Sequence, residues 1–373
     1  MIKKFKDNNA VDLGADKTDD QYTYTFNGEL GSLDHALVTG SLAQSITGVG
    51  VWGINSAEWS DRGYAYGATD GTSPYRSSDH DPILVGISAD VLPVTIDLLS
   101  INDFHGRLEA SGAVAGAAVL GGMVRSYEAA NPHTLFVGAG DLIGASTFTS
   151  FIQNDQPTID AFNAIGLDAS AFGNHEFDQG RADVDERILH EADWPYLAAN
   201  LYDRATGEPA YQEYELREFD GVTIGFIGAV TDDLESLVSP DGIASLDVRE
   251  VVPEVNRVAD QLSDGDAANG EADLLVLLVH EGAATTDISS VTDDSAFGQI
   301  VSGADPEIDM IVSGHTHLAY NHDVPIPGTD RTRPVISSGQ YGEKYAHSRI
   351  VFDPATGEFT IDTEVLDLAG FEP

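Results

Sequence analysis

The sequence predicts an α/β domain from about residue 94 onward, preceded by a smaller β-rich segment that forms a partial N-terminal appendage. Three observations lead to this prediction. Apolar, β-branched runs recur after residue 94, helical patterns lie between them, and the earlier residues form short strand-like runs between Gly- and Ser-rich turns. Continuous apolar strands that alternate with helices indicate sheets that are buried on both faces.

Five apolar runs are expected to be the buried strands of this domain. They are residues 94–101, 134–139, 222–230, 273–280 and 308–314. Residues 347–368 are expected to form a closing hairpin that turns at 353–357. In the β-rich segment, strand-like runs occupy 22–28, 35–43 and 82–88.

Helices are expected between these strands. Over 251–262, apolar residues recur every three or four positions, and Val184, Ile188 and Ala192 share the same spacing. A further helix is predicted at 156–166, because Pro stands near its start and Gly at its end.

Composition divides the chain further. We expect a disordered leader at 1–21, which contains four of the five lysines. The other predicted divisions are the β-rich segment at 22–88, a linker at 89–93, the α/β domain at 94–366 and a tail at 367–373.

The chain is strongly acidic, with 62 Asp and Glu against 18 Lys and Arg and a formal charge of −44. Such a surface suits high salt or an extracellular medium and argues against tight binding to a nucleic-acid backbone. A phosphate substrate would need a local positive charge, which a bound metal would supply. The absence of Cys excludes disulfides and thiolate metal ligands, and no apolar run reaches the length of a membrane span.

Metal-type side chains stand at the carboxyl ends of the predicted strands. They are Asp103, His105, Asp141, Asn174, His175, His280, His315 and His317. Ligands of open α/β sheets gather at these ends, so residues far apart in sequence are expected to share one cleft. A single His or Asn in such a place is more often structural, but five motifs in this order favour a metal site.

This ligand set combines oxygen and imidazole, which suits Zn, Mn, Fe, Co or Ni. Seven of these eight side chains, all but His175, are the candidate ligands, and seven are too many for one ion that must also accept a substrate. They suit two divalent ions with a shared carboxylate, and Asp141, alone on its strand, is the natural bridge. Gly140, Gly173 and Gly314 stand beside the ligands and allow tight turns there.

The motifs "DFH", "GD", "GNHE", "VHEG" and "GHTH" resemble those of the bacterial 5′-nucleotidase family, within the calcineurin-like metallophosphoesterases. The resemblance covers about residues 94–366 and implies a four-layer α/β/β/α metallophosphatase sandwich. It further implies the metal ligands. Asp103, His105 and His317 would hold the first ion, Asn174, His280 and His315 the second, and Asp141 both.

The resemblance also implies roles for two residues that are not ligands. His175 would face the substrate and either stabilise the transition state or protonate the leaving group, and Asp178 would orient it. Glu176 has no derived catalytic role, and we expect it to start a helix or to support the ligands from behind. Full-length relatives continue into a C-terminal domain that recognises the nucleoside, and we expect that domain to be missing here.

The β-rich segment resembles the C-terminal end of secreted nucleases of the endonuclease/exonuclease/phosphatase superfamily. The resemblance rests on "SLDHALVTGSLA" and "SDHDP". It implies an acid/base pair at Asp79 and His80 and an active-site carboxylate at Asp34. The earlier strands of that family are absent, so we expect this nuclease remnant to be inactive alone.

We therefore expect a two-metal hydrolase of phosphate monoesters, foremost nucleoside 5′-monophosphates. A 2′,3′-cyclic nucleotide or a UDP-sugar remains an alternative substrate, and an inactive fragment of a secreted nuclease–nucleotidase fusion is an alternative of another class. The resemblance implies an extracellular, periplasmic or cell-surface location.

Overall fold

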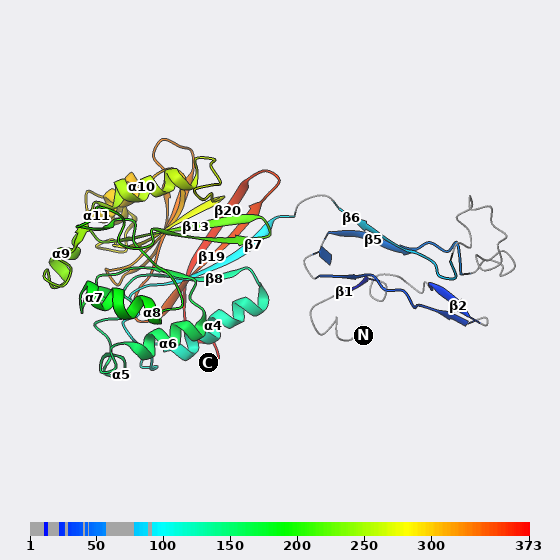
Figure 1. Cartoon of the computed structure of the whole chain (residues 1–373), viewed down its shortest axis with the longest axis horizontal. Helices are drawn as coiled ribbons and strands as arrows, with labels where there is room; N and C mark the ends of the chain where they lie inside the picture. The colour runs from blue at the N-terminus through cyan, green and yellow to red at the C-terminus, as the bar shows by residue number, and fades with distance from the viewer. Residues whose placement is uncertain are drawn as a thin grey trace. The chain divides into compact units, whose positions relative to one another are not determined.

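The computed structural model describes residues 11–13, 22–26, 29–39, 42–43, 45–56, 78–88 and 92–373. The chain divides into two compact units, Met1–Leu92 and Pro93–Pro373. This boundary falls within the predicted linker at 89–93. Figure 1 shows both units, coloured from blue at the N-terminus to red at the C-terminus.

A first six-stranded sheet of the second unit has the order β10-β9-β8-β7-β19-β20. Its strands are β7 (Val94–Ile101), β8 (Thr134–Ala139), β9 (Ala169–Ala171), β10 (Tyr196–Leu197), β19 (Lys344–Asp353) and β20 (Glu358–Asp367). Strands β7 to β10 are parallel. The predicted closing hairpin is confirmed, because β19 pairs antiparallel with both β7 and β20.

A second six-stranded sheet has the order β12-β13-β15-β16-β18-β17. Its strands are β12 (Tyr214–Phe219), β13 (Val222–Val230), β15 (Leu274–His280), β16 (Ile308–Ser313), β17 (Ala319–Pro325) and β18 (Thr332–Ser338). The four inner strands are parallel, and the two edge strands run antiparallel to their neighbours. A separate pair joins β11 (Leu201–Asp203) to β14 (Leu246–Val248).

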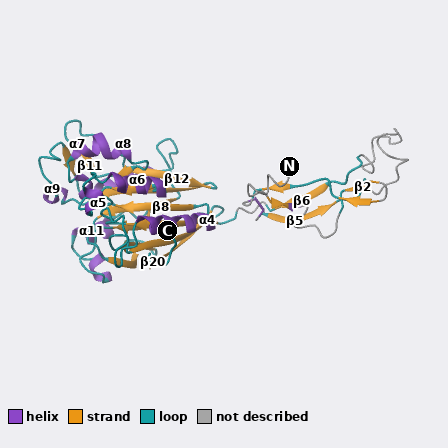
Figure 2. Cartoon of the chain, turned by 90° about the horizontal axis from the view of Figure 1, so that it is seen from below, coloured by secondary structure: helices purple, strands orange, loops and turns teal. Residues whose placement is uncertain are grey.

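The two sheets pack face to face and helices cover their outer faces. Along β7, Ile96 and Leu98 belong to the core between the sheets, whereas Leu99 and Ile101 belong to the core beneath the helices. Figure 1 shows α4, α6 and α8 on one side of the sheets and α10 on the other, and in Figure 2 α4 and α6 lie in front of β8. This is the predicted four-layer α/β/β/α arrangement.

The helices of this unit differ widely in length. They are α4 (Ala117–Ala130), α5 (Phe148–Phe151), α6 (Gln156–Ile165), η3 (His175–Phe177), α7 (Arg181–Asp183), η4 (Val184–Ile188), α8 (Leu189–Glu191), α9 (Leu234–Leu237), α10 (Val251–Leu262), η5 (Ile288–Val291) and α11 (Ala296–Gly303). No helix among the described residues is both long and apolar enough to cross a membrane.

Two of the three predicted helices are confirmed, with bounds close to those predicted from the sequence. Helix α10 buries its predicted apolar face, and α6 ends at Gly166, whose φ of 93° is the left-handed conformation that Gly tolerates. The third differs. The N–H of Leu189 donates to the carbonyl of Val184, which makes η4 a π-turn, and Ala192 is already extended. Val184 and Ile188 are nevertheless buried in one core, and Ala192 packs against it, so the predicted apolar face is kept although the helix ends before Ala192.

The described part of the first unit consists mainly of short antiparallel strand pairs. The pairs are β1 (Val11–Asp12) with β4 (Leu37–Val38), β2 (Tyr24–Phe26) with β3 (Glu29–Gly31), and β5 (Ile46–Val51) with β6 (Ile83–Ile87). Of the predicted leader, residues 11–13 are described and include β1 rather than a disordered chain. The other residues of the leader lie outside the described ranges.

Candidate metal centre

The predicted ligands follow five strands whose carboxyl ends meet. Strands β7, β8 and β9 are neighbours in one sheet, and β15 and β16 are neighbours in the other. Three groups of side chains there have ligand atoms within 4.8 Å of one another. The groups are Asp103, His105 and His317; His105, Asp141 and His175; and Asp141, His280 and His315.

Around Asp103, two imidazoles converge on a carboxylate. The Nε2 atom of His317 lies 3.3 Å from Oδ1 of Asp103, and Nε2 of His105 lies 3.9 Å from the same oxygen. The two Nε2 atoms lie 3.3 Å apart. Oδ1 of Asp103 is buried and has no hydrogen-bond partner among the described residues, which is costly unless a cation satisfies it.

Around Asp141, histidine side chains again surround a carboxylate and form a second cluster. Nε2 of His280 lies 3.0 Å from Oδ2 of Asp141 and 3.2 Å from the amide oxygen of Asn174. The ring of His315 lies 5.1 Å from that of His280. Nε2 of His105 lies 3.7 Å from Oδ2 of Asp141. One carboxylate oxygen therefore lies between a histidine of each cluster, as a bridging ligand requires.

Three of the imidazoles are fixed through their outer nitrogen. Nδ1 of His105 lies 2.8 Å from the carbonyl oxygen of Gly144, and Nδ1 of His280 lies 2.8 Å from that of Ala139. Nδ1 of His317 lies 2.6 Å from Oε1 of Gln340. An oxygen acceptor at Nδ1 holds the proton there and leaves Nε2 as a free lone pair, the form in which His binds a metal.

The backbone is strained at these positions. Five predicted ligands have left-handed φ angles that are unusual for residues other than Gly: Asp103 (50°), His105 (48°), Asp141 (52°), His315 (72°) and His317 (61°). Each such residue costs about 1–3 kcal/mol, and strain of this kind clusters at functional sites.

Of the three glycines predicted to allow tight turns, Gly140 has a left-handed φ of 83°, whereas Gly173 and Gly314 allow close approaches instead. A Cβ at Gly173 would lie 2.2 Å from Oδ1 of Asp141, and one at Gly314 would lie 2.7 Å from the carbonyl oxygen of Ala139. Any larger residue would push the two strand ends apart.

Glu176 supports the loop that carries Asp141. Its buried carboxylate accepts the backbone N–H groups of Asp141, Leu142, Ile143 and Gly173 at 2.7–3.3 Å. Burial raises the pKa of Glu176. The sequence left a choice between a helix start and a support behind the ligands. In the structure Glu176 does both: it lies in the short helix η3, and its carboxylate supports the loop behind the ligands.

His175 lies at the edge of the two clusters, half-buried. Its Nδ1 lies 3.0 Å from both carboxylate oxygens of Asp178, and this hydrogen bond raises the pKa of His175. Its backbone N–H donates to Oδ1 of Asp141 at 2.8 Å. The ring lies 5.1 Å from that of His105. The predicted His–Asp pair is thus brought together beside the predicted ligands.

The pKa values within the clusters follow burial and charge. Burial lowers the pKa of His105. Burial also disfavours the charged form of His280, but the carboxylate of Asp141 outweighs it and raises the pKa of His280 to about 10. The buried carboxylates thus attract positive charge strongly, whether it is a proton or a metal ion.

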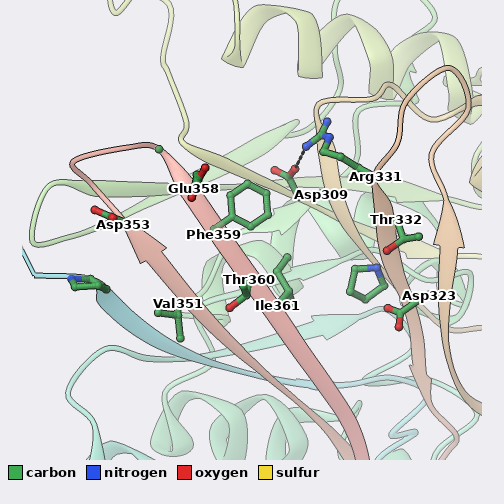
Figure 3. A pocket seen from close by; sticks show the side chains of 13 residues that line it. Asp309, Asp323, Arg331, Thr332, Val351, Asp353, Glu358, Phe359, Thr360 and Ile361 are labelled. Atoms are coloured by element: carbon green, nitrogen blue, oxygen red, sulfur yellow. Dashed lines mark hydrogen bonds and ion pairs between the residues drawn. The ribbon is translucent and has the colours of Figure 1, made fainter.

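Several hollows lie near the surface of this unit. One, of about 490 Å³, is lined by His175 and Asp178 together with Phe151, Ile152 and Arg187. A larger one, of about 760 Å³, lies between β18 and β20 and is lined by the paired Asp309 and Arg331 and by Phe359 (Figure 3). None of the predicted site residues lines the larger hollow.

In the first unit, two of the predicted nuclease residues are in contact. Nδ1 of His80 lies 2.8 Å from Oδ2 of Asp34, and both side chains are about one third exposed. Asp79, half-buried, directly precedes His80.

Sequence reasoning missed three residues at the metal centre. Gln340 and Tyr341 follow β18, and Arg107 follows His105 by two positions. The ring of Tyr341 lies 5.8 Å from that of His105 and 5.4 Å from that of His317. "GQYG" contains no metal-type residue, and only its place after a buried strand could have marked it.

Comparison with known proteins points to one family. The pattern of the family described as calcineurin-like phosphoesterase matches residues 96–319. A 5′-nucleotidase from Vibrio vulnificus is 30% identical over 259 residues, which are 66% of this chain and 45% of that protein. An endonuclease from Bacillus subtilis, YhcR, is 28% identical over 287 residues, 70% of this chain and 22% of that protein. The chain thus spans less than half the length of these relatives.

Solved structures share the fold. The calcineurin-like phosphoesterase YfkN from Bacillus subtilis is 23% identical and superposes with a TM-score of 0.59. The match covers 74% of this chain and 92% of that structure. At this identity the likeness supports the four-layer architecture alone.

Proposed function

The chain belongs to the calcineurin-like phosphoesterase family, which makes it a phosphoester hydrolase, and on that premise we propose that it hydrolyses phosphate monoesters at a two-metal centre. The observation that carries the proposal is the position of Oδ2 of Asp141. This oxygen lies between Nε2 of His105 and Nε2 of His280, one histidine from each cluster.

The residues present fit two divalent cations. Asp103, His105 and His317 would hold the first, Asn174, His280 and His315 the second, and Asp141 both. Imidazole nitrogens with free lone pairs, two carboxylates and one amide oxygen suit Zn, Mn, Fe, Co or Ni. The unpartnered Oδ1 of Asp103 supports this fit, because a buried carboxylate oxygen needs a cation or a donor.

Bound divalent ions would supply positive charge for the phosphoryl oxygens and lower the pKa of a water. His175 would do the remaining proton chemistry. Asp178 holds its Nδ1, so Nε2 of the charged imidazole can donate to the leaving oxygen. The bond to Asp178 raises the pKa of His175 and favours this charged form.

Nucleoside 5′-monophosphates are the substrate class that we propose first. The support is the Vibrio 5′-nucleotidase, which is similar over most of the second unit. Cyclic nucleotides and UDP-sugars remain alternatives, because the same centre suits any phosphate ester. We also propose that the enzyme works outside the cytoplasm, because the cell wall protein Lmo0130 of Listeria monocytogenes is 28% identical over 315 residues, 73% of this chain and 38% of that protein.

Metal content and phosphate release, measured on the same samples, test the proposal. The wild type, His175→Ala and a control, His190→Ala, which alters an exposed histidine on α8, would each be loaded with Mn or Zn. We expect about two ions per chain in all three proteins. We expect release of phosphate from AMP by the wild type and His190→Ala only.

A comparison of hydrolysis rates on several phosphate esters would identify the preferred substrate. AMP, bis-p-nitrophenyl phosphate and a UDP-sugar would be compared under the same conditions, and fastest turnover of AMP would support the nucleotide assignment. A wild type that binds no metal would overturn the two-metal proposal, whatever its activity.

For the first unit, we propose that the pair of Asp34 and His80 is a nuclease remnant without activity of its own. DNA cleavage by the wild type and by His80→Ala should be equally absent. Cleavage that only the wild type shows would refute this.

A further inference from the structure

Arg107 is a cation without an acidic partner in a strongly acidic protein. The chain has 62 acidic residues, and seven arginines of the second unit form ion pairs with them. Arg107 is half-buried, and among the described residues no carboxylate pairs with it. Its guanidinium carbon instead lies 4.2 Å from the centre of the Tyr341 ring. The charge of Arg107 therefore remains available to an anion.

Tyr341 places this cation beside the metal centre. Its ring contacts His105 and His317, two of the predicted ligands of the first ion. Its backbone N–H donates to the carbonyl oxygen of Asp103 at 2.7 Å. Its φ of 59° is left-handed, which is strained for an aromatic residue. Such strain persists only where the surroundings hold the residue in place, so the ring is a fixed platform.

The two loops around this platform are bound to each other and to the ligands. Arg107 lies in the turn after β7, where its N–H donates to the carbonyl oxygen of Phe104 at 3.2 Å. Gln340, next to Tyr341, accepts from Nδ1 of His317. The elements that orient the predicted ligands of the first ion therefore also orient the guanidinium.

We propose that Arg107 is a substrate-binding residue whose guanidinium binds an oxygen of the substrate phosphate on the Tyr341 side of the centre. This inference rests on the proposed function, since it assigns a further contact to the same substrate. The planar fork of N–H donors matches phosphate oxygens, and stacking on a ring fixes its orientation without a competing carboxylate. A local cation also offsets the repulsion that a charge of −44 exerts on a phosphate anion.

Binding of inorganic phosphate tests the proposal independently of turnover. Isothermal titration of the Mn-loaded full chain would compare the wild type with Arg107→Ala and Arg107→Lys. The matched control is Arg125→Ala, which removes the same charge from an exposed position on α4. We expect Arg107→Ala to weaken phosphate binding roughly tenfold or more, Arg107→Lys to weaken it less, and Arg125→Ala to leave it unchanged.

Kinetics and a second pair of variants separate binding from folding. Arg107→Ala should raise KM for AMP with metal content unchanged. Tyr341→Phe keeps the ring and should bind phosphate like the wild type. Tyr341→Leu removes the ring and should weaken binding in the same direction as Arg107→Ala.

Unchanged phosphate affinity in Arg107→Ala, in a wild type that hydrolyses AMP, would overturn this inference and leave the proposed function standing. A wild type that binds phosphate through Arg107 but hydrolyses no ester would support this inference and overturn the proposed function.

Discussion

Nδ1 of His175 lies 3.0 Å from each carboxylate oxygen of Asp178, three residues further along the chain. Asp178 contacts no predicted metal ligand through its side chain; it also accepts the N–H of Ala145. Its influence on the centre therefore passes through the orientation and charge of one imidazole. In the proposed mechanism Asp178 is therefore a positioning residue, whose effect can be separated from metal binding.

We predict that Asp178→Asn lowers kcat for AMP about 10–100-fold and leaves metal content unchanged. The amide would still accept a hydrogen bond but would no longer favour the charged imidazole. Steady-state kinetics and metal analysis on the same preparation would measure both. Asp160→Asn, at an exposed position of α6, is the control. Equal kcat values in the two variants would remove Asp178 from the mechanism.

Asp141 and Asp103 are predicted to differ in the number of ions that they hold. Oδ2 of Asp141 lies near a histidine of each cluster, whereas Asp103 lies near His105 and His317 of one cluster. Asp141→Asn should therefore lose most of both ions, and Asp103→Asn should lose about one. Elemental analysis after dialysis against Mn would count them. Similar losses in the two variants would argue against Asp141 as a bridge.

Most of the predicted ligands could be identified from sequence because they end or closely follow a predicted apolar strand. Strand ends of parallel sheets meet at one edge, so Asp103, Asp141 and His280 come together although they are far apart in the chain. The continuous apolar runs likewise predicted the buried strands of both sheets.

What the sequence could not show depends on tertiary contacts. Glu176 lies within the "GNHE" motif, but its partners include three N–H groups of another loop. The stacking of Arg107 on Tyr341 joins turns more than 200 residues apart and leaves no periodic signal. Helix α4 was also missed, because its Gly and Ala residues give a weak apolar pattern.

Glu176→Ala should destabilise the fold markedly. Removal of the carboxylate leaves four N–H groups without their acceptor in a buried loop, at a cost of about 3 kcal/mol or more. Urea unfolding followed by circular dichroism would give the difference in free energy. Glu128→Ala, at an exposed position of α4, should change it by less than about 0.5 kcal/mol. A loss as small in Glu176→Ala would mean that water replaces the carboxylate.

Asp309 should make stability depend on pH in the direction opposite to that of most carboxylates. It is buried beside the larger hollow (Figure 3), where it accepts from Arg331 at 3.0 Å and from the N–H of Leu275 at 3.1 Å. The charges of Arg333 and Glu307 also interact electrostatically with its carboxylate. Burial outweighs the arginine and raises the pKa of Asp309 from 3.8 to about 6.

Because the folded protein holds this proton more tightly than the unfolded chain, Asp309 favours folding below its ordinary pKa, and that contribution is lost as pH rises through about 6. Asp309→Asn removes the titration. Its free energy of unfolding, relative to that of the wild type, should therefore rise by up to about 3 kcal/mol from about pH 4 to about pH 7. Parallel urea titrations at several pH values would measure this difference, with Asp323→Asn, an exposed carboxylate of the same hollow, as the control. A difference that stays constant across this range would show that Arg331 compensates fully for the burial of Asp309.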